Sequence, residues 1–272
     1  MAIDMEVICV GNELLIGKIP NTNAHWLAKQ ATQLGVNVKR VTVVQDLIDE
    51  IANSICEAIA RKPRFIITTG GLGPTFDDKT LQGIARALNR KLEVNPAALE
   101  MVKQRIIEYA KKRQMPTETE LTPPRVKMAT FPEKTEPIIN PIGTAPVAKA
   151  NVDDTVLFAL PGVPSEMEAI FTQTIKPLLK EAVGCNMFCE QSIFVEDIME
   201  SRLAPLIDQV MSENEGVYIK SHPMLTEIKP RIEAHLTTIA SPEEEPARKI
   251  FKAATELCRL IEQNNGKAQF QQ

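Results

Sequence analysis

The chain has 272 residues, which is more than one compact domain usually contains, so we expect one large domain and a second, smaller one. Apolar residues make up 44% of the chain and charged residues 24%, as in an ordinary folded globular protein. The formal net charge of -4 gives no general attraction to nucleic acid or to an anionic membrane, so nucleic-acid binding is not expected.

The amino-terminal sequence and the cysteines indicate the compartment. MAIDMEVICVG carries Asp4 and Glu6 and is no signal peptide, and no apolar run reaches the roughly 20 residues that a membrane span needs. The 5 cysteines are odd in number and lie mostly in apolar runs, unlike a disulfide framework. We expect a cytoplasmic protein with reduced thiols and no membrane contact.

Short β-branched runs alternate with helical patterns in the first third of the chain. The expected strands are 6–10, 37–44 and 64–69, and the expected helices are 22–34, 48–59 and 80–90. This alternation predicts right-handed crossovers and a parallel sheet with helices on both faces. Ligands of such sheets bind at the carboxyl ends of the strands.

The rest of the chain divides near Gly184. Before this glycine we expect a helix over 96–113, an irregular proline-rich stretch over 115–146, a strand over 155–160, a turn over 161–167 and a helix to Val183. After it we expect a strand near 191–195, a helix over 199–211, strands over 216–220 and 231–239, a helix over 242–262 and a frayed end over 266–272. The predicted fold class is α/β, with a mostly parallel sheet in residues 1–184 and a smaller α+β domain in residues 185–272.

The sequence TTGGLGPTFDDKT, residues 68–80, follows a predicted strand and precedes a predicted helix. Gly70, Gly71 and Gly73 allow main-chain N–H groups to face an anion, and the dipole of the following helix also favours negative charge. Phe76 stands where a Walker A motif and the dinucleotide fingerprint each need a glycine. The loop therefore predicts a phosphate site of another kind.

Two aspartates, Asp77 and Asp78, end this loop. One of them would cap the following helix. The other carboxylate, together with Asp46 from the neighbouring strand end, would place two acids beside a phosphate, and like charges about 4 Å apart repel by on the order of 1–4 kcal/mol. A divalent cation between them removes this repulsion and polarises the phosphoryl oxygens. Two interpretations stay open: a phosphorylated ligand held with a metal, and a structural turn with a helix cap.

Two further loops carry candidate ligand-binding residues. GNELLIGKIPNTN, residues 11–23, brings Glu13 to the same edge of the sheet, although a solvated loop acid explains this residue equally well. INPIGTAP, residues 139–146, offers Gly143 and Thr144, although its prolines could simply stiffen a connection. In PGVPSEM, Ser165 followed by Glu168 predicts a helix cap rather than a nucleophile.

Taken together, five motifs resemble those of a known family, the amino-terminal part of the competence/damage-inducible protein CinA, which is built on the molybdopterin-binding domain shared with MoaB and Mog. The matching stretches are GNELLIGKIPNTNAHWLA, VVQD, ITTGGLGPTFDD, NPIGTAP and LPGVPSEM, in this order within residues 5–167. ESRLAPLIDQV and YIKSHP resemble the small KH-like domain of CinA. APVAK departs from the pattern, since relatives usually have a glycine after the second proline.

The resemblance implies a three-layer α/β domain with a ligand pocket. In Mog-type relatives the aspartates that match Asp46 and Asp78 act in the adenylation of molybdopterin, whereas CinA-type proteins are associated with metal-dependent hydrolysis of the pyrophosphate of ADP-ribose. The deamidase domain of full-length CinA proteins has no counterpart in this sequence, so deamidation of nicotinamide mononucleotide is not implied.

The resemblance also implies roles for individual residues. Asp46, Asp78 and Glu13 would be catalytic, and Asp46 and Asp78 would also hold a divalent metal ion, Mg²⁺ or Co²⁺. The implied ligand-binding residues are Gly70, Gly71, Leu72, Gly73, Thr75, Asp77, Asn140, Gly143, Thr144, Pro161 and Gly162.

We therefore expect a metal-dependent nucleotide pyrophosphatase that acts on ADP-ribose or a related diphosphate. One alternative is molybdopterin binding or adenylyl transfer in molybdenum cofactor biosynthesis, and another is a non-catalytic nucleotide-binding regulatory module. In each case the ligand is a nucleotide or a pterin. A homodimer is expected, because pairing would bury the exposed strand edges of the small domain.

Overall fold

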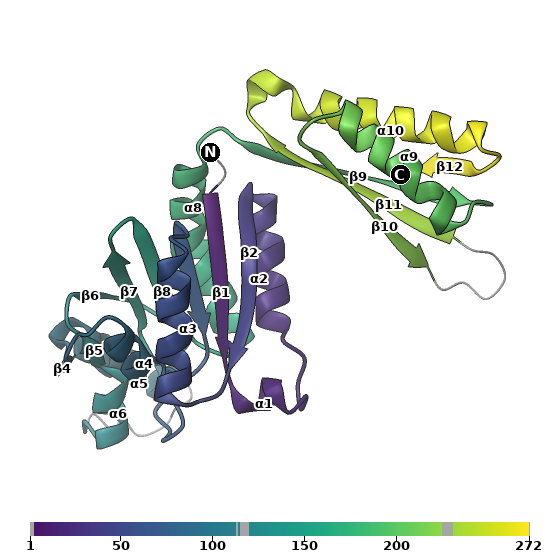
Figure 1. Ribbon diagram of the computed structural model, residues 1–272. Helices are drawn as coiled ribbons and strands as arrows, with labels where there is room; N and C mark the ends of the chain where they lie inside the picture. Colours follow the sequence, from purple (N-terminus) through teal and green to yellow (C-terminus); the bar gives the residue numbers. More distant parts are fainter. Residues whose placement is uncertain (1–2, 113, 115–119, 225–230, 272) are drawn as a thin grey trace. The chain divides into compact units, whose positions relative to one another are not determined.

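The computed structural model (Figure 1) describes residues 3–112, 114, 120–224 and 231–271. The chain divides into two compact units, one with residues 3–32 and 36–182 and one made chiefly of the residues from 183 onward. Among the described residues, no helix has the length and apolar character that crossing a membrane requires.

The first unit is built on a six-stranded sheet with the strand order β2-β1-β3-β8-β7-β6. These strands are β1 (Ile3–Val10), β2 (Val36–Val44), β3 (Phe65–Thr69), β6 (Thr135–Ile138), β7 (Val147–Val152) and β8 (Thr155–Leu160). The strands β2, β1, β3 and β8 pair in parallel, and β7 runs antiparallel to both of its neighbours. The prediction of a mostly parallel sheet is confirmed.

Helices cover both faces of this sheet. They are α1 (Asn12–Leu15), α2 (Thr22–Gln33), α3 (Ile48–Ala60), α4 (Thr80–Ala87), α5 (Pro96–Lys112), α6 (Pro123–Met128), α7 (Pro164–Ile170) and α8 (Lys176–Val183), with a π-helical turn over Phe171–Ile175 between the last two. On one face, Ile51 of α3 and Ile84 of α4 pack in one core cluster with Ile8 of β1. On the other face, Trp26 of α2 meets Phe171 edge to face at 5.3 Å, and Figure 1 shows α2 and α8 opposite α3.

The stretch 115–146, predicted to be irregular, contains short regular elements. Within its described part lie α6, β6 and β5 (Thr130–Pro132), which pairs with β4 (Leu92–Val94); residues 115–119 lie outside the described residues. The prolines that suggested irregular structure are compatible with these elements. A helix tolerates proline in its first turn, and a strand tolerates proline, which has no N–H, at a position that does not donate a hydrogen bond to the neighbouring strand.

The second unit has a four-stranded antiparallel sheet in the order β10-β11-β9-β12. Its elements are β9 (Met187–Glu196), α9 (Glu200–Glu213), β10 (Val217–Met224), β11 (Arg231–Ala240), a 3-10 turn (Pro242–Glu244), α10 (Pro246–Gln263) and β12 (Lys267–Phe270). Alternate residues of β11, including Ile232 and Leu236, form a core with Leu257 of α10. The carboxyl-terminal segment, predicted to fray, instead pairs with β9 as β12, a strand too short for its apolar pattern to be recognised.

Candidate functional site

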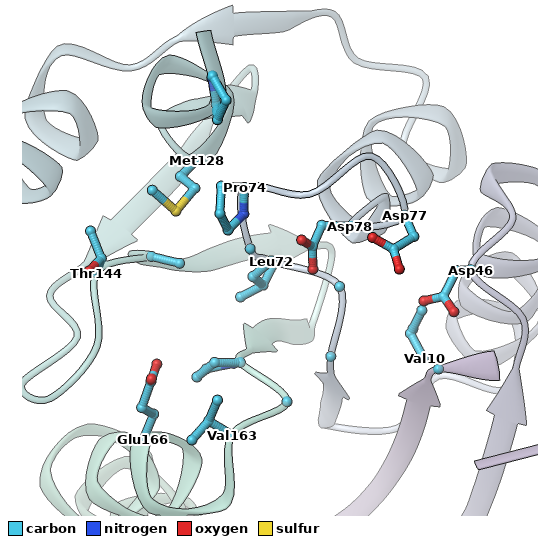
Figure 2. Close-up of a pocket in the computed structure, with 18 of the residues that line it drawn as sticks. Val10, Asp46, Leu72, Pro74, Asp77, Asp78, Met128, Thr144, Val163 and Glu166 are labelled. Atoms are coloured by element: carbon cyan, nitrogen blue, oxygen red, sulfur yellow. The ribbon is translucent and has the colours of Figure 1, made fainter. Parts of the chain in front are cut away.

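A cavity of about 760 Å³ lies at the carboxyl ends of β1, β2, β3 and β8. Figure 2 shows Asp46, Asp77 and Asp78 toward one side of it, and Thr144, Val163 and Glu166 toward the other. The cavity is where the parallel-sheet rule places a ligand. The cavity forms because the loops that follow these parallel strands all begin at the same edge of the sheet.

Most of the predicted site residues line this cavity. Those that do are Glu13, Asp46, Gly70, Gly71, Leu72, Gly73, Asp77, Asp78, Thr144, Pro161 and Gly162. Three predicted residues, Thr75, Asn140 and Gly143, are not among the lining residues and instead hold lining residues in place. The lining residues that sequence reasoning missed include Ile106, Tyr109, Arg125, Met128 and Glu166.

The glycine loop after β3 starts with a close main-chain approach. Gly70 has φ of +105°, and a Cβ atom there would lie 2.2 Å from the carbonyl oxygen of Val10. Its amide donates to the Leu160 carbonyl at 3.0 Å, which continues the pairing of β3 with β8. The prediction that the Gly70 amide faces an anion is therefore wrong, because this donor is used within the sheet.

The next three amides of the loop, unlike that of Gly70, are not used in the sheet. Within the described part of the chain, the N–H groups of Gly71, Leu72 and Gly73 have no hydrogen-bond acceptor, although all three residues line the cavity. Gly71 has φ of +68°, which lets the chain turn here without strain. A run of unpaired amides in a turn is the arrangement that binds anions.

Asp78 fixes the shape of the loop instead of capping the next helix. Its Oδ2 accepts the amide of Thr75 at 2.8 Å and the hydroxyl of Thr75 at 2.6 Å. The residue at the cap position of α4 is Lys79, which makes no side-chain capping bond. The helix-cap interpretation of Asp77 and Asp78 is therefore wrong, and an Asp–Thr turn replaces it.

Asp77 shares the same threonine. The hydroxyl of Thr75 also contacts Oδ1 of Asp77. This contact, followed by a main-chain hydrogen bond and the nearby charges of Lys127 and Lys79, lowers the pKa of the Asp77 carboxyl. The loop thus keeps Asp77 in the anionic form at neutral pH.

Asp46 and Glu13 enter the cavity from the loops after β2 and β1. The amide of Asn12 donates to Oδ2 of Asp46 at 2.7 Å, so Asp46 ties these two loops together. The carboxylate of Glu13 folds back over Gly11, where a Cβ atom would lie only 2.5 Å from Oε1. Asp46 is therefore held at the cavity wall by a hydrogen bond, and the Glu13 carboxylate lies against Gly11.

The cavity lining is strongly acidic. Among the described residues, its charged side chains are five carboxylates, those of Glu13, Asp46, Asp77, Asp78 and Glu166, and one guanidinium, that of Arg125. No group of three or more His, Cys, Asp or Glu side chains in the described residues is arranged to hold a metal ion. Asp46 and Asp78 each use Oδ2 in the bonds above, so a metal would need phosphate oxygens beside the remaining carboxylate oxygens.

Behind the glycine loop lies a second cavity of about 470 Å³, which shares Gly71, Leu72, Gly73 and Asp78 with the first. Lys127 of α6 lines only this second cavity, and its Nζ donates to the carbonyls of Gly73, at 3.4 Å, and Thr75. Burial lowers the pKa of the Lys127 ammonium group, against the opposing effect of the nearby aspartates. Lys127 was missed because the preceding prolines masked its helix in the sequence.

The loop 139–146 is organised by a buried asparagine. Asn140 is only 1% exposed; its Oδ1 accepts the amides of Ile142 and Gly143, and its Nδ2 donates to the Ala145 carbonyl and to Glu166. Arg105 of α5 donates to the Gly143 carbonyl at 3.0 Å and further fixes the loop. Thr144 is presented to the cavity as a result.

The helix α7 begins differently from the prediction. Its cap residue is Val163, and no side chain makes a capping bond, so the predicted cap by Ser165 is wrong. Proline in the first turn and the acidic Glu166 stabilise this helix start instead. The asparagines near α2 are structural: Asn21 caps the helix through the Ala24 amide, and Asn23 joins Thr69 to the Gly162 carbonyl.

Comparison with known proteins identifies relatives. Residues 6–181 match the family model of a probable molybdopterin binding domain. A protein of Aeropyrum pernix is 44% identical over 261 residues, which are 96% of this chain and 94% of that protein. A protein of Sulfurisphaera tokodaii is 41% identical over 253 residues, or 93% and 92% of the two chains.

Among solved structures, the crystal structure of the protein CinA with unknown function from Thermoplasma acidophilum is 38% identical. It has a TM-score of 0.57 and covers 65% of this chain and 98% of its own. The resemblance to CinA is thereby supported, while the KH-like assignment of the second unit stays a prediction. Since the family model spans more than half of the sequence, the chain belongs to the family of probable molybdopterin binding domains.

Proposed function

We propose that the cavity binds a phosphorylated pterin or nucleotide, with a phosphate group on the amides of Gly71, Leu72 and Gly73. The observation that supports this most is the run of three unpaired amides, among the described residues, at the wall of a cavity. Membership of the molybdopterin-binding family favours a ligand of the pterin class. The volume of about 760 Å³ is within the range of small-molecule sites.

The acidic lining requires positive charge beside a phosphate. Asp46 and Asp78 would hold a divalent metal, Mg²⁺ or Co²⁺, together with oxygens of the ligand phosphate. Such an ion would supply charge neutralisation and polarise the phosphoryl group. The protein's own part is to fix the carboxylates, through the amides of Asn12 and Thr75.

Hydrolysis of a pyrophosphate bond, as in ADP-ribose, is the second candidate. It is supported by Asp46 and Asp78 flanking the same cavity as the unpaired amides. In this function the amides stabilise the phosphate, the Asp46 carboxylate orients the attacking water, and Glu13 and Asp77 assist. Adenylyl transfer to molybdopterin would use the same groups.

Calorimetric titration tests the binding proposal. The purified protein is titrated with inorganic pyrophosphate, GDP and ADP-ribose, with and without Mg²⁺. We expect saturable, Mg²⁺-dependent binding that weakens at least about tenfold in Asp78→Asn, because the loop loses charge-assisted bonds. Asn still accepts the Thr75 amide, so the fold is retained. Asp208→Asn, on an exposed part of α9, is the matched control.

The two functions give different products. If the protein is a hydrolase, incubation with ADP-ribose and Mg²⁺ or Co²⁺ yields AMP, and Asp46→Asn abolishes that yield. Binding without AMP at any metal concentration would remove hydrolysis and leave the binding function. A pterin fluorophore that copurifies with the protein would favour the molybdopterin class directly. Absence of binding to every phosphorylated ligand would overturn both.

A further inference from the structure

The cavity has two chemically different ends. Figure 2 shows Asp46, Asp77 and Asp78 on one side, near the glycine loop, and Met128, Val163 and Glu166 on the other. Ile106 and Tyr109 of α5 add further apolar surface to the lining. The first end suits phosphate and metal, whereas the second carries the apolar side chains of Met128 and Val163 beside the Glu166 carboxylate and the Thr144 hydroxyl.

The carboxylate of Glu166 is held in one position. Its Oε2 accepts a 2.7 Å hydrogen bond from Nδ2 of Asn140, a side chain that is 1% exposed. Asn140 is itself locked, since its other donor and acceptor bonds all go to the loop 142–145. Glu166 is therefore a fixed acceptor, and Oε1 takes no part in this bond.

Gly143 leaves the space that Glu166 needs. A Cβ atom at Gly143 would lie 1.9 Å from Oε2 and 2.6 Å from Oε1 of Glu166. The φ angle of Gly143 is not in the left-handed region, so the glycine is required here for space and not for conformation. Loop and helix thus fit together around the carboxylate.

A fixed carboxylate determines which chemical groups of a ligand can lie beside it. It repels phosphate, and it can accept hydrogen bonds but cannot donate them, with room for several donors on its two oxygens. A planar heterocycle between apolar side chains satisfies such an acceptor when it presents a ring N–H next to an amino group, since the two donors match the two oxygens. Pterin and guanine carry this pair of donors; hypoxanthine lacks the amino group.

We propose that the Glu166 carboxylate accepts hydrogen bonds from the heterocyclic ring of the ligand. It thereby selects rings with a 2-amino group next to a ring N–H, as in pterin and guanine. This inference rests on the proposed phosphate-binding function of the same cavity. Glu166 is a specificity-determining residue, and Asn140 and Gly143 position its carboxylate.

The test compares GDP with IDP, which differ only in the 2-amino group, by calorimetric titration of the full chain with Mg²⁺. Wild type is expected to bind GDP at least about tenfold more tightly than IDP, because a pair of hydrogen bonds between one side chain and one base typically discriminates by this much. Glu166→Gln should reduce this ratio to near one, since Oε1 of Gln accepts from Asn140 and its amide group then faces the cavity. Affinity for inorganic pyrophosphate should not change.

Matched variants separate selectivity from folding. Glu168→Gln removes a carboxylate of the same helix that does not line the cavity, and should keep the wild-type ratio. Gly143→Ala, which displaces the Glu166 carboxylate, should lower the ratio as Glu166→Gln does. Unchanged melting temperatures for the two glutamine variants establish that the fold is intact.

The outcomes are distinct. Equal wild-type affinities for GDP and IDP, or an unchanged ratio in Glu166→Gln, overturn the inference and leave phosphate binding standing. Failure of GDP, IDP and pyrophosphate to bind at all overturns the proposed function itself.

Discussion

The ammonium group of Lys127 shows how one residue outside the cavity can control the donors inside it. It lines the second cavity and donates to the carbonyls of Gly73 and Thr75 in the glycine loop. Because Gly73 carries both one of these carbonyls and one of the unpaired amides, the bonds hold this end of the glycine loop in place. Lys127 is thus a positioning residue for the anion site.

Substitution of Lys127 should lower the affinity for phosphate and leave the protein folded. For Lys127→Met we expect about a tenfold loss of pyrophosphate affinity, the result of losing one or two hydrogen bonds from a charged donor. Lys127→Arg should recover part of it. Titration calorimetry measures the affinities, with the exposed Lys91→Met as the control. Unchanged affinity in Lys127→Met would show that the loop holds its shape unaided.

Individual site residues could be predicted from the sequence where their motif has few structural explanations other than ligand binding. The glycines and aspartates of 70–78 were found because a glycine turn between a strand and a helix has few other uses. Glu166 was missed because a glutamate near a helix start reads as an ordinary first-turn acid. Only the contact with Asn140, 26 positions away, reveals its special environment.

A buried ion pair joins β1 to the residue that follows α3. Glu6 of β1 is only 3% exposed, and its two carboxylate oxygens accept from Nε and Nη2 of Arg61, each at 2.8 Å. The hydrogen bond with Glu6 raises the pKa of Arg61. This bidentate pair anchors the last turn of α3 to the sheet that carries the site.

Arg61→Ala should therefore destabilise the first unit. It leaves the buried Glu6 carboxylate unpaired, and we expect the free energy of unfolding to fall by about 3 kcal/mol. Arg86→Ala is the contrasting variant: the Arg86–Asp49 pair is exposed on both sides and should contribute at most about 1 kcal/mol. Urea denaturation followed by circular dichroism measures both. Equal losses in the two variants would contradict the argument.

The parallel strands and their helices could be predicted because their patterns are long and regular, as in FIITT and the isoleucine spacing of α3. The elements β4, β5, β6 and β12 could not, since three or four residues carry no readable period. The consequence for the site was large. The antiparallel β6–β7 hairpin is what brings the loop 139–146 to the cavity edge, beside the end of β8.

At the scale of the whole molecule, each of the two units contains a protected and an exposed cysteine. Cys9 is buried in β1, and burial raises its pKa. Burial and the charge of Glu262 raise the pKa of Cys258, in α10, to about 11. Cys56 and Cys185 are exposed. Thiol reactivity can therefore report on the two units separately.

Alkylation should follow this division. Because a raised pKa reduces the reactive thiolate fraction, iodoacetamide at pH 8 should modify Cys56 and Cys185 well before Cys9 and Cys258. Peptide mass spectrometry after timed quenching measures the order. In denaturant the four rates should converge. Early modification of Cys258 alone would mean that the second unit opens independently of the first.

Association between chains is expected from the exposed strand edges of the second unit. The homodimer stays a prediction, and light scattering at several protein concentrations tests it. The two units are separate in their cores, so a variant of the second unit such as Leu257→Ala distinguishes assembly from ligand binding, which is assigned to the first.

The hairpin β6–β7 also bears on how relatives of this protein could diverge. A loop at the tip of an antiparallel pair tolerates insertions and deletions without altering the strand order, whereas a crossover between parallel strands is constrained by its helix. The unpaired amides of Gly71, Leu72 and Gly73 lie at the start of such a crossover. Asn140, the partner of Glu166, lies in the loop of the hairpin. Natural variation can therefore exchange one heterocycle for another while the anchor for the phosphate is inherited unchanged.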